Sequence, residues 1–350
     1  MKYLLFGITV ALLFSCADTK PGETENPLLS NADSVLVLDK MSGVSLEMPG
    51  QPMEGERMDG ILDFGVKWVA LIPYGYTERG KAKVNYSWDG RWWGESLNGT
   101  AKCIEFAQER GLKTMLKPHV WVVGQGWPGD FDLTKESDWQ IWESSYREYI
   151  LDCARLADSM EVDVFCIGTE YRKSVVKRSD FWKKLIKEVR EIYSGPMTYA
   201  ANWDNYEKVN FWDQLDFIGI DAYFPLSKER EPALEELKTG WINKSKELKA
   251  FSEKWNRKIA FTEYGFKSVD FMYGGSKSNE DLKPNMTNQE TGYSAFFNTV
   301  WKEEWMLGGF LWKWHFSDGA GGENNTRYTP QNKPAQKIVK AFYGVNSESN

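Results

Sequence analysis

The chain has 350 residues, of which 27% are charged, and a formal net charge of −7. This length suits one α/β barrel of about 250 residues with insertions, although it also allows two domains. No cluster of Lys and Arg is present that could neutralise a phosphate backbone, so we expect no nucleic-acid partner.

The first 38 residues do not read as part of a folded domain. Lys2 precedes an apolar stretch, Tyr3 to Phe14, that is too short to span a bilayer as a stable helix. The following Ser15-Cys16 completes a resemblance to a bacterial lipobox, which implies a lipoprotein signal peptide over residues 1–15 and lipidation of Cys16. An ordinary cleaved signal peptide is the alternative. Residues 17–34 are mostly polar and contain Pro21, Gly22 and Pro27, so we predict a flexible tether, with bounds at residues 16–38.

On that interpretation the protein is lipid-anchored in the bacterial cell envelope, at the periplasmic or the surface face of the outer membrane. Its only expected membrane contact is the N-terminal anchor. We expect a monomer.

The remaining cysteines and the histidines do not indicate a metal or redox centre. Cys103, Cys153 and Cys166 lie in helix-like or strand-like patterns and are predicted to be small buried hydrophobic residues. The two histidines, His119 and His315, have no metal-ligand spacing around them. We therefore expect no metal and no organic cofactor.

From Val44 onward, short apolar runs alternate with helical patterns. Strands are predicted at residues 43–48, 66–73, 112–119, 162–168, 196–201, 215–221, 258–263 and 308–314. Helices are predicted at residues 56–64, 96–110, 137–159, 179–193, 232–255, 288–305 and 335–342. This alternation predicts a single-domain α/β protein, a (β/α)8 TIM barrel over residues 39–345. An open doubly wound sheet is the alternative, but no Gly-rich nucleotide loop follows the first strand.

Two predicted strands end at a glutamate. Residues 162–170 read VDVFCIGTE and residues 258–263 read KIAFTE, which places Glu170 and Glu263 at strand ends. The carboxyl ends of barrel strands meet at one mouth, and two carboxylates there are the minimum equipment for cleaving a glycosidic bond. A retaining enzyme needs an acid and a nucleophile about 5 Å apart. We predict that Glu170 and Glu263 are catalytic.

Aromatic residues are the compositional outlier, with 17 Trp, 16 Tyr and 19 Phe. Exposed indole rings suit a ligand with flat C–H faces and many hydroxyls, such as a sugar. Tyr223 follows the strand beside that of Glu263, and its hydroxyl would keep this nucleophile ionised and oriented. The candidate substrate-binding residues are Trp92, Trp93, His119, Trp121, Asn202, Trp203, Asp221, Trp312 and Trp314.

Several of these candidates have a structural alternative. Asp221 is as well explained by a structural role at the barrel mouth as by substrate contact, and Trp92 and Trp93 could anchor a loop. Trp312 and Trp314 share a strand face by alternation, so one could form the floor of the sugar site while the other packs.

The runs FCIGTE, NWDNY, FWDQLDFIGIDAYFPL, IAFTEYGF and FLWKW resemble the strand ends of glycoside hydrolase family 113, which contains β-mannanase-like enzymes of a clan of retaining barrels. The resemblance covers roughly residues 40–342. It implies that Glu170 is the acid/base and Glu263 the nucleophile, and that residues 91–95 and 117–121 contact substrate. Thr169 departs from the clan, which usually has an Asn there to bind the sugar 2-hydroxyl. Asn202 is our candidate for that contact.

Together, the residues and the resemblance lead us to expect a retaining hydrolase of β-1,4-mannosidic bonds in mannan or manno-oligosaccharides. Another β-glycan is an alternative substrate, because aromatic platforms do not distinguish an axial from an equatorial 2-hydroxyl. A non-catalytic glycan-binding lipoprotein is the alternative from another class. A pure binder has no need for both glutamates, which argues against it.

Overall fold

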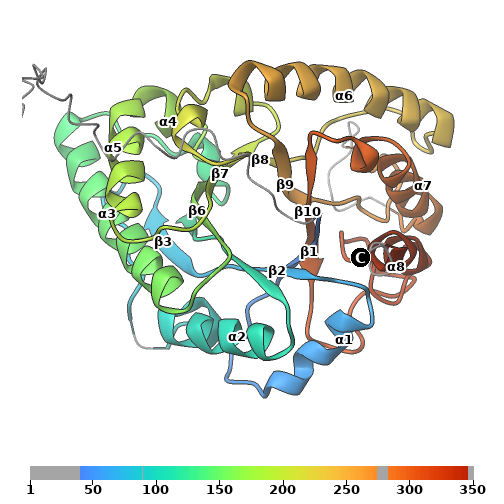
Figure 1. Ribbon diagram of the computed structural model, residues 1–350, viewed down its shortest axis with the longest axis horizontal. Helices are drawn as coiled ribbons and strands as arrows, with labels where there is room; N and C mark the ends of the chain where they lie inside the picture. The colour runs from blue at the N-terminus through green and yellow to red at the C-terminus, as the bar shows by residue number, and fades with distance from the viewer. Residues whose placement is uncertain (1–39, 89, 274–282, 346–350) are drawn as a thin grey trace, which may run out of the picture. The chain divides into compact units, whose positions relative to one another are not determined.

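The computed structural model describes residues 40–88, 90–273 and 283–345. Eight parallel strands close into a barrel in the order β1-β10-β9-β8-β7-β6-β4-β2, surrounded by helices (Figure 1). These strands are β1 (Met41–Leu46), β2 (Trp68–Leu71), β4 (Lys113–Leu116), β6 (Val164–Thr169), β7 (Met197–Asn202), β8 (Ile218–Asp221), β9 (Ile259–Tyr264) and β10 (Met306–Trp314). The predicted (β/α)8 barrel is confirmed. The predicted signal peptide, Cys16 and the whole tether lie outside the described residues.

The helices are α1 (Asp59–Leu62), α2 (Leu97–Glu109), α3 (Glu136–Ser159), α4 (Ser174–Lys177), α5 (Ser179–Arg190), α6 (Leu234–Trp255), α7 (Met286–Phe297) and α8 (Ala335–Val345). Ser96 caps α2, because its hydroxyl accepts from the Gly99 amide at 3.1 Å. One predicted helix is shorter than expected, since α7 ends at Phe297 and only a short 3-10 turn, Val300–Lys302, follows. Within the described ranges, no helix is long and apolar enough to cross a membrane.

The barrel strands are buried on both faces, because side chains fill the barrel and helices cover its outside. This explains why they read as nearly continuous apolar runs rather than alternating ones. Cys103, Cys153 and Cys166 are free and buried, as predicted.

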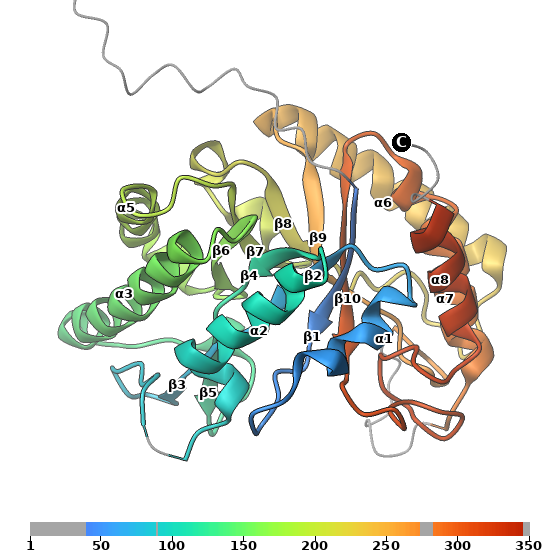
Figure 2. The same ribbon diagram turned by 60° about the horizontal axis from the view of Figure 1, so that its bottom comes forward.

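A second, two-stranded parallel sheet extends the mouth of the barrel. It pairs β3 (Tyr74–Glu78) with β5 (His119–Val123), which lie beyond the ends of β2 and β4 (Figure 2). The strands predicted from the sequence instead end at Pro73 and His119, and no further strand is predicted directly after either of them. Pro73 and Pro118 lie at equivalent points, between β2 and β3 and between β4 and β5. A proline has no backbone N–H to donate to a neighbouring strand. The pairing therefore stops and resumes as a separate sheet.

A substitution at Gly219 on β8 can test how closely neighbouring barrel strands pack. An alanine Cβ there would lie 2.4 Å from the Tyr199 carbonyl oxygen and 2.8 Å from Thr198 Oγ1. We expect Gly219→Ala to lower the free energy of unfolding by about 1–3 kcal/mol, because backbone atoms of a neighbouring strand cannot move aside cheaply. Urea unfolding would measure this loss. The control is Gly319→Ala, which has no atom within 4 Å and should change stability little; equal losses in the two variants would contradict the argument.

Candidate active site

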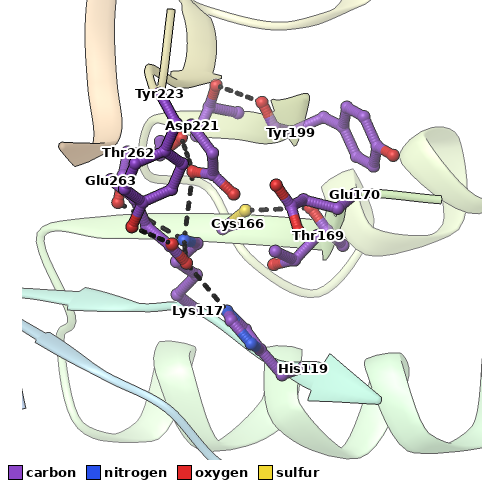
Figure 3. A network of polar contacts seen from close by, with 12 residues as sticks. Lys117, His119, Cys166, Thr169, Glu170, Tyr199, Asp221, Tyr223, Thr262 and Glu263 are labelled. Atoms are coloured by element: carbon purple, nitrogen blue, oxygen red, sulfur yellow. Dashed lines mark hydrogen bonds and ion pairs between the residues drawn. The ribbon is translucent and has the colours of Figure 1, made fainter. Parts of the chain in front are cut away.

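Glu263 on β9 is held by two hydrogen-bond donors, one on each carboxylate oxygen. Lys117 Nζ lies 2.6 Å from Oε1, and the Tyr223 hydroxyl donates to Oε2 at 2.8 Å (Figure 3). The contact expected between Tyr223 and Glu263 is therefore present. A charged donor and a neutral one, each on a different oxygen, together fix the plane of the carboxylate.

Lys117 is wholly buried and serves a second carboxylate. Its Nζ also lies 3.2 Å from Asp221 Oδ1, which accepts from the Thr262 hydroxyl at 2.7 Å. Burial alone would lower the pKa of Lys117, but Asp221 and Glu263 raise it above its ordinary value. The side chain therefore remains an ammonium group.

Asp221 on β8 lies beside Glu263 in the strand register, and Asn202 on β7 lies on its other side. Burial, followed by the charge of Glu263, raises the pKa of Asp221 to about 7. Its Oδ2 atom is buried with no hydrogen-bond partner in the described part of the chain. Because its side chain is fully buried and its Oδ1 faces Lys117 and Thr262, the structure supports the structural alternative for Asp221 over the substrate contact.

Glu170 follows β6 and has the left-handed backbone conformation, with φ 57°. A non-glycine residue in this region is strained by about 1–3 kcal/mol, and such strain clusters at functional sites. The turn is tightly packed, since a Cβ on Gly168 would lie 2.4 Å from the Tyr146 hydroxyl oxygen. This close approach explains the glycine in the FCIGTE run.

The environment of Glu170 differs from that of Glu263. Its Oε2 accepts from the indole Nε1–H of Trp127 at 2.5 Å, and no charged donor contacts it among the described residues. Burial, then the negative charges of Asp221 and Glu263, raise the pKa of Glu170 well above its ordinary value. The protonated form of Glu170 is therefore favoured while Glu263 is paired with an ammonium group.

His119 on β5 lies next to Glu263, with Nε2 3.6 Å from Oε1. Burial, then Lys117 and Lys313, lower the pKa of His119 well below its ordinary value, so the ring is neutral. The ring stacks parallel to Trp312, at 6.1 Å between centroids and 3° between planes, and Tyr74 meets it edge-on at 5.2 Å. Trp312 and His119, with their rings parallel, thus form an aromatic surface beside Glu263.

An aromatic row leads from this surface along the β3–β5 sheet. Tyr76 lies 6.2 Å from Tyr74 and faces Trp121 in the strand register. Trp88 meets Tyr76 edge-on at 5.1 Å, and the Tyr76 hydroxyl donates to Glu95 Oε2 at 2.8 Å. The outer end of the row is open to solvent, because Trp121 is 48% exposed.

Comparisons with known proteins bear on this geometry. The sequence model of Glycoside Hydrolase Family 113 matches residues 51–333. The chain belongs to this family. It is a glycoside hydrolase, as the resemblance implied. No curated protein matches its sequence.

Solved structures agree with this family 113 assignment. The family 113 β-mannanase AaManA from Alicyclobacillus acidocaldarius, solved in complex with ManMIm, is 25% identical with a TM-score of 0.78, over 90% of this chain and 100% of that one. Another family 113 β-1,4-mannanase is 23% identical with a TM-score of 0.73, over 87% and 99% of the two chains. A β-glucuronidase from Ruminococcus gnavus, 13% identical with a TM-score of 0.58 over 87% and 50%, shares the fold alone.

Of the other predicted substrate-binding residues of this family 113 hydrolase, three tryptophans are at least partly exposed and one is buried away from the site. Trp92 is 53% exposed, whereas Trp93 and Trp203 are half-buried, and Trp203 meets Phe224 edge-on. Trp314 lies apart from the cluster, since it is buried and packs edge-on against Phe64 at 5.2 Å. The register between β1 and β10 shifts just before Trp314, so simple alternation does not place it beside Trp312.

Sequence reasoning missed three contributors to the site. Lys117 was included only within the run of residues 117–121, while Trp127 and Tyr328, which lies 5.4 Å from Tyr223, were not among the candidates. A lysine at the carboxyl end of the predicted strand over residues 112–119 was a usable signal for Lys117, because buried lysines are rare unless paired. The long-range partners of Trp127 and Tyr328 left no local sequence signal.

Because Asp221 and Glu263 share the ammonium group of Lys117, removing this group should strongly lower the stability of the fold. We expect Lys117→Met to lower the free energy of unfolding by about 3–5 kcal/mol, because two buried carboxylates lose their cation. Adding Asp221→Asn should recover part of this loss, since one of the two charges is then removed. Urea unfolding of both variants would measure the coupling.

Additive losses in that pair of substitutions would show that Lys117 and Asp221 act independently. A matched control is Lys102→Met, which removes a lysine that pairs with Glu105 at 2.8 Å on the exposed side of α2. Its effect on stability should be far smaller, because water screens an exposed ion pair.

Proposed function

We propose that this protein hydrolyses β-1,4-mannosidic bonds with retention of configuration, with Glu170 as the acid/base and Glu263 as the nucleophile. The proposal is carried by the contrast between the two glutamates at the ends of β6 and β9. Glu263 is paired with an ammonium group, whereas half-buried Glu170 contacts no cation among the described residues and has a raised pKa. The choice of substrate is supported by the similar family 113 structures, which are β-mannanases.

The chemistry needs this contrast. In the first step Glu263 attacks the anomeric carbon while protonated Glu170 gives its proton to the leaving oxygen, so the glycosidic bond breaks as a glycosyl ester forms. In the second step the Glu170 carboxylate takes a proton from water, and the resulting hydroxyl displaces Glu263. Because its pKa is raised, Glu170 can hold the proton that it gives up in the first step.

The nucleophile needs to be ionised and fixed in direction. Lys117 and Tyr223 donate to different oxygens of Glu263, so rotation of the carboxylate would break both contacts. The Lys117 charge favours the ionised form before attack. Neutral His119 beside it can hydrogen-bond a sugar hydroxyl without competing for the negative charge.

The aromatic surfaces suggest a path for the sugar chain. Trp312 and His119 would form the floor under the sugar that reacts, and Trp121 would extend the contact along β5. Trp92 and Trp93 would contact sugars near the rim of the mouth. On the other side of Asp221, Asn202 remains our candidate for the 2-hydroxyl, although its side-chain amide already donates to Asp204 at 2.8 Å.

Product analysis on mannan, glucomannan, xylan and cellulose oligosaccharides tests the proposal. We expect cleavage of the mannan substrates, with the β-anomer appearing first in NMR spectra. Glu170→Ala and Glu263→Ala should each reduce the rate on unactivated substrates by at least ~10²-fold, because a proton donor or the covalent step is lost. The control is Glu207→Ala, which removes an exposed glutamate from the connection after β7.

Two outcomes would reject the assignment. If the α-anomer appears first, the enzyme inverts configuration and Glu263 is not a nucleophile. If no glycan is cleaved while one is bound, the chain is a glycan-binding protein on a hydrolase fold. Cleavage of xylan or cellulose instead of mannan would keep the mechanism and change the substrate.

We also propose that lipidated Cys16 holds the protein in the outer membrane of the bacterial envelope. The support is the sequence alone, namely the apolar run ending at Phe14 and the polar stretch after Cys16. We expect Cys16→Ala to abolish labelling by a radioactive fatty acid and to prevent recovery of a mature, detergent-phase form. Unchanged labelling of the variant would reject the anchor while leaving the hydrolase proposal intact.

A further inference from the structure

Trp127 makes a one-directional contact with the acid/base. An indole N–H can donate a hydrogen bond but cannot accept one, and it points at Glu170 Oε2 from 2.5 Å. In a protonated carboxyl group the carbonyl oxygen is the better acceptor. Trp127 therefore favours the form of Glu170 in which Oε2 is the carbonyl oxygen and Oε1 carries the proton.

The Trp127 ring is held from two sides. It folds back over Gly129, where a Cβ would lie 2.3 Å from the ring. Above it lies the guanidinium of Arg172, with Cζ 4.7 Å from the ring centroid. A cation over an indole face is the favoured geometry of this interaction. The backbone of Gly129 and the guanidinium group of Arg172 thus both lie against the Trp127 ring.

Arg172 is itself fixed by two carboxylates on different connections. One terminal nitrogen pairs with Asp130 Oδ1 at 2.8 Å, three residues after Trp127 in the same loop. The other pairs with Asp204 Oδ2 at 2.7 Å, in the connection after β7. Because Arg172 follows Glu170 by only two residues, it ties the loop that carries Trp127 to the strand end that carries the acid/base.

We propose that Arg172 is a positioning residue for Glu170: by clamping Trp127, it determines that the transferable proton sits on Glu170 Oε1. This inference rests on the proposed role of Glu170 as acid/base. The proton leaves Oε1 for the leaving oxygen in the first step and returns to Oε1 from water in the second. The Trp127 N–H is never transferred; it stabilises the carboxylate formed between the two steps.

The prediction concerns the leaving group and the pH. The charged and titratable groups that face Glu170 are Lys117, Tyr199, Asp221, Glu263 and Tyr328, from β4, β7, β8, β9 and the connection after β10. None of them is changed by substituting Trp127 or Arg172. Loss of the indole N–H removes a donor to the ionised form, so the pKa of Glu170 should rise further and the alkaline limb of kcat/KM should move to higher pH.

The experiment compares two substrates of the full chain: mannotetraose, whose sugar leaving group needs a proton, and a dinitrophenyl β-mannobioside, whose leaving group does not. Trp127→Phe keeps a ring without the donor, and Arg172→Lys keeps a charge without the planar fork. We expect both to lose about tenfold in kcat/KM on mannotetraose, with little change on the aryl substrate. Both should also shift the alkaline limb upward.

Arg178 provides a matched control. Its guanidinium lies 5.7 Å from the centre of the Trp139 ring and pairs with Glu136 and Glu143, so it repeats the chemistry of Arg172 with a different tryptophan and different carboxylates. Arg178→Lys should leave both substrates and the pH profile unchanged, whatever its effect on stability. Thermal unfolding of all variants would show that each is folded at the assay temperature.

The outcomes separate this inference from the proposed function. If Arg172→Lys keeps the wild-type rate ratio of the two substrates and the wild-type alkaline limb, Arg172 does not position the acid and the inference is overturned. An equal loss on both substrates also overturns it, since a general structural role would produce that result. If Glu170→Ala cleaves both substrates as wild type does, the proposed function itself fails.

Discussion

The active site depends on one buried cation, the ammonium group of Lys117. Three carboxyl groups interact with it electrostatically, namely Glu170, Asp221 and Glu263, and all three are largely or wholly buried. One positive charge cannot compensate three buried negative ones, so the favourable states are those in which some carboxyl groups hold protons. Glu263 has the shortest contact with the cation, at 2.6 Å, whereas Glu170 has none. In the proposed mechanism this difference in charge balance distinguishes the nucleophile from the acid.

Only a closed barrel can arrange this charge balance. Lys117 comes from the end of β4, while its two carboxylate partners come from β8 and β9, and β6 and β7 lie between them in the sheet order. The lysine side chain therefore reaches across the barrel interior rather than along neighbouring strands. Its length and flexibility suit this position, and the surrounding side chains exclude the water that would otherwise screen the pair.

How far the sequence predicts this protein follows from the range of the interactions involved. The eight barrel strands, the glutamates at two strand ends and the contact of Tyr223 follow from local patterns and from the rule that parallel strand ends converge. The β3–β5 sheet was missed because Pro73 and Pro118 act as strand breakers locally, although the pairing resumes beyond them. The position of Trp314 depends on a register shift between β1 and β10, which no local pattern reveals.

The side chains that contact the two glutamates were harder to predict, because these contacts also join residues far apart in the sequence. Lys117 lies 146 residues before Glu263, and Trp127 lies 43 residues before Glu170. The Lys117–Glu263 pair spans the barrel interior, and Trp127 reaches Glu170 from a long loop, so neither spacing nor periodicity encodes either pair. The roles of the substrate-binding candidates, including Asn202, remain predictions, since they depend on a sugar that must still be placed.

The two hydrogen-bond donors differ in a way that suits the two halves of a retaining reaction. In the proposed mechanism Glu263 begins as a carboxylate, and the charged donor Lys117 makes a stronger hydrogen bond with it than a neutral donor would. Glu170 would alternate between acid and base, so a cation at the same distance would make it too weak a base for the second step. The neutral N–H of Trp127 makes the weaker contact that this alternation suits. Arg172 holds this neutral donor in place while directing its own charge toward Asp130 and Asp204.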